Sequence, residues 1–180
     1  MSRIRITGGE WRSRLIQVID GPGLRPTPDR VRETLFNWLG QDLTGLACLD
    51  LFAGSGVLGF EAASRGAASV VLVERDQRAF APLRQNAATL ADARLQVLRA
   101  DALEFAAAAG RQGRRFDLVF LDPPYRQAWL DRLWSVLPAM LDRGARLYVE
   151  AEAAIVPPAP WRAVRQGCAG QVFYHLLEHE

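Results

Sequence analysis

The chain has 180 residues, of which 49% are hydrophobic and 23% charged, as in a soluble globular domain with its own core. Its formal net charge is +2, and all 22 basic residues are arginine. No apolar run approaches the roughly 18 residues of a membrane span, and Cys48 and Cys168 stand alone, so neither a disulfide framework nor a zinc site is indicated. We therefore expect a cytoplasmic protein without a bound metal, in which both cysteines are buried small hydrophobic residues.

The first 24 residues are expected to form a small β-hairpin appendage. Residues 3–6 and 14–19 have the composition of two short strands, and Gly8 and Gly9 lie between them. Residues 1–32 hold seven arginines and only three acidic residues. Clustered arginines on a terminal segment are typical of a phosphate-binding surface, although a solvated basic face is the alternative.

Residues 25–180 are expected to form the main domain, which begins with a helix. Thr27 is the predicted N-cap of this helix, and Pro28 is its predicted first residue. The apolar residues of the helix recur at helical spacing and are predicted to face the core: Val31, Leu35, Trp38 and Leu39. The polar face then carries Arg30, Glu33 and Asn37.

From Leu46 onward, strand-like apolar runs alternate with helical patterns. Strands are predicted at 46–52, 69–74, 94–99, 116–121 and 145–150, and helices at 57–65, 77–90, 102–109 and within 127–141. This alternation favours a parallel sheet covered on both faces. Two further strands, at 161–165 and 171–177, have only a short turn between them, so we expect an antiparallel hairpin at one edge of a sheet of about seven strands. Residues 157–160 mark a proline-rich loop.

A glycine-containing turn, Ala53-Gly54-Ser55-Gly56, follows the first of these strands. Its glycines let a ligand approach the backbone closely, and the free N–H groups of the next helix point into the same space. Asp50, at the end of the strand, is costly to bury unless it is paired or hydrogen-bonded. A carboxylate there suits a cationic group, such as an amino acid's ammonium. The spacing Gly54-x-Gly56-x-x-Gly59 also fits a dinucleotide turn, which keeps a nicotinamide-dependent enzyme as an alternative.

Two further acids end the next two strands. Glu74 lies about 20 residues after the glycine turn, where an acid hydrogen-bonds ribose hydroxyls in dinucleotide-binding folds. A solvated, helix-capping acid is the alternative. Asp101 can accept a hydrogen bond from an exocyclic amine such as adenine N6, or it can cap the helix that begins at Ala102.

The stretch Asp122-Pro123-Pro124-Tyr125 follows the strand at 116–121. Two prolines fix the backbone and remove two N–H donors, so the Asp122 carboxylate and the Pro123 carbonyl are left as acceptors. Tyr125 adds a flat face for stacking. Together they predict a receptor for the amino group of a planar base. A proline turn that only ends the strand is the alternative.

These motifs, from Asp50 to Tyr125, resemble the successive motifs of class I S-adenosylmethionine-dependent methyltransferases. The (Asp/Asn)-Pro-Pro-(Tyr/Phe) signature belongs to the branch that methylates amino nitrogens. The chain as a whole resembles the RsmD family, which methylates guanine N2 in 16S ribosomal RNA. The matching segments are Ile6 to Arg12, Arg25 to Asn37 and Leu49 to Gly56. Lysine, common on the basic surface of that family, is replaced here by arginine, and residues 151–170 match no known motif.

The resemblance implies a Rossmann-like fold, the cofactor S-adenosylmethionine with S-adenosylhomocysteine as product, and the following sites. The cofactor would be held by Asp50, Phe52, Ala53, Gly54, Ser55, Gly56, Glu74, Arg75, Asp101 and Ala102. Catalysis would fall to Asp122, Pro123, Pro124 and Tyr125. The expected contacts to RNA phosphates are Arg12, Arg14, Arg25, Arg30 and Arg32. The expected partner is ribosomal RNA in the 30S subunit or its assembly intermediate, bound by a monomer.

Three other functions stay open. The same acceptor pocket could methylate adenine N6 in DNA or RNA, or a protein glutamine amide. The glycine turn could serve an NAD-dependent oxidoreductase, which leaves residues 122–125 without a purpose. A non-catalytic RNA-binding assembly factor would need no intact cofactor site. His175 and His179 are interpreted as strand residues rather than metal ligands, and Asp131 and Asp142 as solvated charges.

Overall fold

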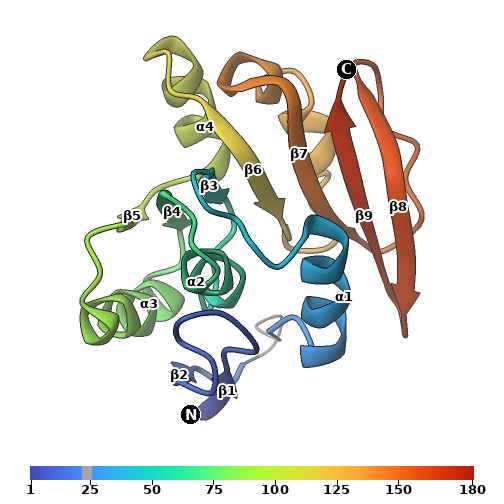
Figure 1. Cartoon of the computed structure of the whole chain (residues 1–180). Helices are drawn as coiled ribbons and strands as arrows, with labels where there is room; N and C mark the ends of the chain where they lie inside the picture. Colours follow the sequence, from blue (N-terminus) through green and yellow to red (C-terminus); the bar gives the residue numbers. More distant parts are fainter. Residues whose placement is uncertain (22–25) are drawn as a thin grey trace.

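The computed structural model describes residues 1–21 and 26–180 (Figure 1). Its strands are β1 (Ser2–Arg5), β2 (Leu15–Val18), β3 (Ala47–Asp50), β4 (Ser69–Glu74), β5 (Leu95–Arg99), β6 (Phe116–Leu121), β7 (Leu141–Ala151), β8 (Trp161–Ala169) and β9 (Val172–His179). Its helices are α1 (Asp29–Leu39), α2 (Val57–Ser64), α3 (Gln77–Leu90), α4 (Ala102–Arg111) and α5 (Trp129–Leu133), with a 3₁₀ turn, η1, at Leu137–Met140. Arg25 and the predicted boundary between appendage and main domain lie outside the described residues.

Seven strands form one sheet in the order β5-β4-β3-β6-β7-β9-β8. The five strands from β5 to β7 run parallel, and β9 pairs antiparallel with both β7 and β8. The predicted α/β class, the mostly parallel sheet and the antiparallel hairpin at its C-terminal edge are therefore confirmed. The order of the strands turns back between β3 and β6, and ligands of open α/β sheets bind beside such a point, at the carboxyl ends of the strands.

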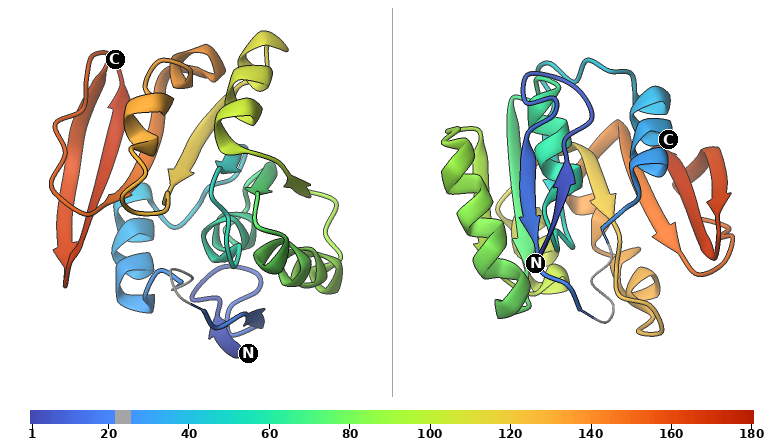
Figure 2. Two further views of the ribbon diagram at one scale, coloured as in Figure 1. Left: turned by 180° about the vertical axis from the view of Figure 1, so that it is seen from behind. Right: turned by 90° about the horizontal axis from the view of Figure 1, so that it is seen from below.

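Two hydrophobic cores lie on opposite faces of the sheet, because successive side chains of a buried strand point to opposite sides. On β3, Cys48 belongs to one core and Leu49 to the other. The first core packs against α1, α2, α3 and the N-terminal hairpin, and the second against α4, α5 and η1. Figure 2 shows these two layers from behind and from below.

The N-terminal hairpin packs against the main domain instead of projecting from it. Strands β1 and β2 pair antiparallel, and Trp11 lies buried in the first core. At the end of α2, the carbonyl of Ser64 accepts from Glu10 N–H at 2.7 Å, and its hydroxyl oxygen accepts from Trp11 N–H at 2.8 Å. On α3, the Asn86 amide exchanges two hydrogen bonds with the Gln17 backbone, at 3.0 and 2.8 Å.

Two local predictions are wrong. Pro28, and not Thr27, is the N-cap of α1, because the Thr27 hydroxyl donates instead to Glu150 at 3.0 Å. The helix expected within 127–141 is confirmed as α5, and the 3₁₀ turn η1 follows it in the same segment. Cys168 is exposed, whereas Cys48 is buried as predicted.

Other predictions on single residues are confirmed. Val31, Leu35 and Leu39 are buried, while the other face of α1 is exposed at Arg30, Glu33 and Asn37. His175 and His179 lie in β9. No helix in the described part of the chain has both the length and the hydropathy needed to cross a membrane.

Candidate active site

The glycine turn after β3 is fixed by hydrogen bonds on both sides. Ala53 N–H donates to the carbonyl of Val73 at 2.9 Å, and Gly54 N–H donates to the Glu74 carboxylate at 2.8 Å. Gly54 and Gly56 have φ values of +52° and +81°, which only glycine adopts without strain. A Cβ on Gly54 would meet no atom within 4 Å, so the space beside this turn is open.

Asp50 is buried at the carboxyl end of β3 and is hydrogen-bonded, as its cost of burial requires. Its Oδ2 accepts from Gly59 N–H at 3.0 Å, in the first turn of α2. Burial raises the pKa of Asp50 to about 7, against the opposing effect of the Gly59 hydrogen bond and with a smaller contribution from the charges of Glu74 and Glu150. The side chain thus fixes the start of the helix that follows the turn.

Glu74 is the last residue of β4, and Asp101 follows the neighbouring strand β5. Glu74 accepts from the N–H groups of Gly54 and Asp76, and Asp76 rather than Glu74 caps α3. Asp101 Oδ1 caps α4, as one of its two predicted roles required, while Oδ2 lies 3.5 Å from Arg75. Each carboxylate keeps acceptor capacity beyond these contacts, because an ionised carboxylate offers about four lone pairs.

Asp122 and Tyr125 follow β6, which pairs with β3 so that Phe120 lies opposite Asp50. Asp122 is half-buried, and burial, followed by the charges of Glu150 and Asp50, raises its pKa well above the usual value. Tyr125 is 42% exposed, which leaves a ring face available for stacking. The acceptor motif and the glycine turn therefore lie at the carboxyl ends of adjacent strands.

The loop after Tyr125 is held against the end of β7. Arg126 and Ala128 have positive φ values of 62° and 48°, which cost energy for residues with a Cβ. Arg126 N–H donates to the Glu152 carboxylate at 3.1 Å. Below the loop, Trp129 packs edge-to-face on Phe52 at 5.2 Å between ring centroids. This contact joins the residue before the glycine turn to the helix that follows the acceptor motif.

Glu150 is a site residue that the sequence analysis missed. It lies at the end of β7, is 4% exposed, and accepts hydrogen bonds from the Thr27 and Tyr148 hydroxyls. The register of β6 and β7, in which Leu121 lies opposite Val149, puts it beside Asp122. The signal was present, because Glu150 ends the apolar run Leu147 to Val149 in the same way that Glu74 ends its own strand.

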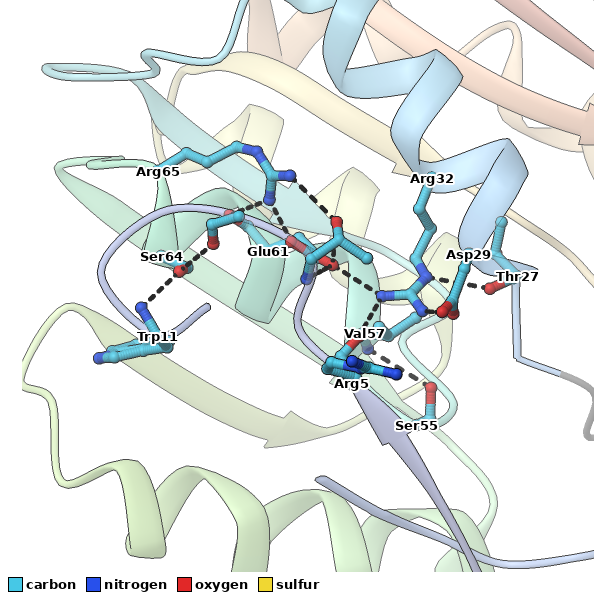
Figure 3. Close-up of polar contacts among 12 residues, drawn as sticks. Arg5, Trp11, Thr27, Asp29, Arg32, Ser55, Val57, Glu61, Ser64 and Arg65 are labelled. Carbon is cyan, nitrogen blue, oxygen red and sulfur yellow. Dashed lines mark hydrogen bonds and ion pairs between the residues drawn. The ribbon is translucent and has the colours of Figure 1, made fainter. Parts of the chain in front are cut away.

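The predicted RNA-contacting arginines separate into two groups. Arg12, Arg14 and Arg30 are exposed. The prediction for Arg32 is wrong, because its side chain is fully buried and ion-pairs with Asp29 and with Glu61 on α2 (Figure 3). A guanidinium enclosed by two carboxylates is not available to a phosphate.

The buried acid Glu61 connects three elements. Its Oε1 accepts from Arg32 at 2.7 Å and from the backbone N–H of Thr7 at 2.7 Å, and its Oε2 pairs with Arg65 (Figure 3). It therefore joins α1 to the N-terminal hairpin and to the end of α2. Among residues 1–21 and 26–180, no group of His, Cys, Asp and Glu has the arrangement of a metal site.

The chain is similar to known methyltransferases over nearly its whole length. A family model described as "Conserved hypothetical protein 95" matches residues 4–178. The Escherichia coli (strain K12) protein named "Ribosomal RNA small subunit methyltransferase D" is 44% identical over 99% of this chain and 91% of its own length. The Haemophilus influenzae protein of the same name is 39% identical over 98% of this chain and 94% of its own length. The solved structure of yhhF from Escherichia coli has a TM-score of 0.88 and 44% identity, and the match covers 99% of both chains.

Proposed function

This chain belongs to the RsmD family of ribosomal RNA methyltransferases, and on that premise we propose that it transfers a methyl group from S-adenosylmethionine to guanine N2 in 16S ribosomal RNA. The observation that carries the proposal is the pairing of β3 with β6. It puts the glycine turn beside the Asp122 motif, so that a methyl donor at one and an amino group at the other are neighbours. An oxidoreductase would have no use for that motif.

The carboxylates at this edge fit the cofactor by their chemistry. S-adenosylmethionine offers an ammonium, ribose hydroxyls and an adenine amine, all of which need acceptors or negative charge. Asp50 and the turn from Phe52 to Gly56 would hold its methionine part, Glu74 and Arg75 its ribose, and Asp101 with Ala102 its adenine. The cofactor, when bound, supplies an electrophilic methyl group on sulfur.

The acceptor motif would hold guanine by its amino group. Guanine N2 is a poor nucleophile, because its lone pair is delocalised into the ring. Hydrogen bonds from its two N–H groups to Asp122 and to the Pro123 carbonyl would hold the nitrogen closer to tetrahedral, with the lone pair directed at the methyl group. Pro124 fixes the backbone of the motif. Positioning of this kind can lower a barrier by several kcal/mol, at most about 7–11.

Tyr125 would stack on the target base after it leaves its RNA stack. Flipping a base costs a few kcal/mol, and one aromatic stacking contact returns roughly 1–3 kcal/mol. As the nitrogen becomes cationic, the Asp122 carboxyl group would stabilise the developing charge. The exposed residues Arg12, Arg14 and Arg30, together with Arg25, would bind RNA phosphates. We further propose that the protein acts as a monomer in the cytoplasm, on the 30S subunit or its assembly intermediate.

The direct test is methyl transfer from labelled S-adenosylmethionine to 30S subunits and to free ribosomal RNA, followed by mass analysis of the nucleosides. We expect N2-methylguanine, and methyladenine in its place would refute the proposal. Asp122→Ala should abolish most of the turnover while calorimetry shows S-adenosylmethionine binding nearly unchanged. Calorimetry with NAD in place of S-adenosylmethionine tests the oxidoreductase, which alone should bind it.

A further inference from the structure

Glu150 is a buried carboxylate beside the acceptor motif, and three side chains contact it. Its Oε1 accepts from the Thr27 hydroxyl at 3.0 Å and from the Tyr148 hydroxyl at 2.9 Å. Leu121 lies opposite Val149 in the parallel pair β6–β7, so the next residues along the two strands, Asp122 and Glu150, lie side by side. Two carboxyl groups in contact repel each other unless one proton lies between them.

The hydrogen bonds indicate where that proton lies. Two hydroxyl donors stabilise the ionised form of Glu150, which leaves the shared proton on Asp122. In the described part of the chain, no arginine ion-pairs with either carboxyl group. The other ionisable groups that interact with the pair are Asp50 on β3, Tyr125 after β6 and Tyr148 on β7. One step further out, Glu74 acts on Asp50, Glu152 on Tyr125 and Tyr174 on Tyr148.

We propose that Glu150 is a positioning residue that holds Asp122 and, through it, takes up the proton released by the guanine amino group. This inference rests on the proposed function. The shared proton binds one Asp122 oxygen to Glu150 and leaves the other oxygen fixed toward the site, where it accepts from guanine N2. Glu150 itself touches neither the cofactor nor the base.

The step balances in atoms and charge. The guanine nitrogen forms its bond to the methyl carbon as the carbon–sulfur bond breaks and leaves its electron pair on sulfur. The nitrogen, now cationic, gives one proton to the free oxygen of Asp122. The proton already on Asp122 passes to Glu150. The pair carries one negative charge before the step and none after it, and the extra proton then leaves to solvent.

The test compares Glu150→Gln, which removes the charge, with Glu150→Asp, which keeps it, and with Glu178→Gln as a control on an exposed carboxylate of β9. With N2-methylguanine as product, kcat and the RNA KM are measured against pH, and S-adenosylmethionine affinity is measured by calorimetry. We expect kcat of Glu150→Gln to fall about 10- to 100-fold, within or just below the usual range for general base catalysis. Affinity for the cofactor should change less than about twofold, and Glu150→Asp should recover part of the rate.

The pH profile separates this role from a merely structural one. In the parent protein, methyl transfer requires that one of the two carboxyl groups, Asp122 or Glu150, is ionised so that it can take up the proton. The ionised group is Glu150, which the Thr27 and Tyr148 hydroxyls and the protonated Asp122 stabilise. In Glu150→Gln the anion must be Asp122, which has fewer donors and a higher pKa, so the acid side of the profile should move to higher pH. Tyr148→Phe removes one donor to Glu150 and should move it in the same direction by a smaller amount.

A uniform fall in rate at every pH, or an unchanged rate, would overturn the inference while the parent protein still makes N2-methylguanine. If Glu150→Gln does not fold, an unmoved profile for Tyr148→Phe overturns it equally. Absence of N2-methylguanine from the parent protein contradicts the proposed function instead, so the two failures are distinguishable.

Discussion

Replacing Glu61 by glutamine should be among the most destabilising single-atom changes in this protein. Glu61 and Arg32 are fully buried, and Arg65 is nearly so. The amide cannot neutralise either guanidinium, and water cannot reach the two arginines in its place. Removing one partner of a buried ion pair costs about 3–5 kcal/mol, out of the roughly 5–15 kcal/mol that stabilises a typical domain.

The assay is urea unfolding followed by far-UV circular dichroism, with thermal unfolding as a second measure. For a chain of this size about 1 kcal/mol shifts Tm by 2–4 °C, so Glu61→Gln should lower Tm by roughly 6–20 °C. Glu10→Gln is the matched control, because Glu10 is 67% exposed and pairs with Arg94 at 3.3 Å, a contact worth at most about 1 kcal/mol. A loss below about 1 kcal/mol for Glu61→Gln would refute the reasoning from burial.

Three further outcomes follow from single positions. In urea titrations, Asp50→Asn should stabilise the cofactor-free protein by roughly 2–4 kcal/mol at pH 8 and by little near pH 4. The pKa of Asp50 is about 7 in the folded protein and 3.8 in the unfolded chain, so the ionised carboxylate costs stability as pH rises from about 4 to 7. Gly9→Ala places a Cβ into the backbone at the end of α2 and should cost several kcal/mol by the same titration; Gly40→Ala, where φ is also positive but the space is open, should cost about 1. Reversing the charges of Arg12 and Arg14 should weaken RNA binding and reduce the slope of log affinity against log salt concentration by about two. Reversing the charges of the arginines of β8 should leave both unchanged, and filter binding at several salt concentrations measures the difference.

The fold of the main domain could be predicted because its hydrophobic periodicity, its capping residues and the acids at its strand ends all indicate the same structure. The predicted limits of α3 and β6 agree with the observed ones. For α3, an N-cap acid, Asp76, precedes a helical pattern that ends in an αL residue, Ala91. The acids at the strand ends were predictable by the same logic, since a carboxylate that closes an apolar run needs a partner or a ligand.

The sequence could not show which polar side chains would be buried by a segment far away in the chain. Arg32 follows the core residue Val31 and lies on the side of α1 that the hairpin and α2 cover. Its partner Glu61 is 29 residues away, in a helix whose eight residues are all buried. Helical spacing places a side chain on a face, but it does not show which face a distant segment will cover. The prediction of Thr27 as N-cap fails for the same reason, because the residue that its hydroxyl contacts, Glu150, is 123 residues away.

Thr27 links the two networks that these buried acids form. Its carbonyl accepts from Arg32 Nε at 3.1 Å, and its hydroxyl donates to Glu150. A continuous series of polar contacts therefore runs from Glu61, which holds the hairpin, through Arg32 and Thr27 to Glu150, which lies beside Asp122. Because every carboxylate in the series is buried or half-buried, moving the hairpin away from the acceptor motif would leave charges unpaired in the interior. The hairpin that bears Arg12 and Arg14 is thus held at a fixed position relative to the acceptor carboxyl group, as a docking surface must be if it is to set which base enters.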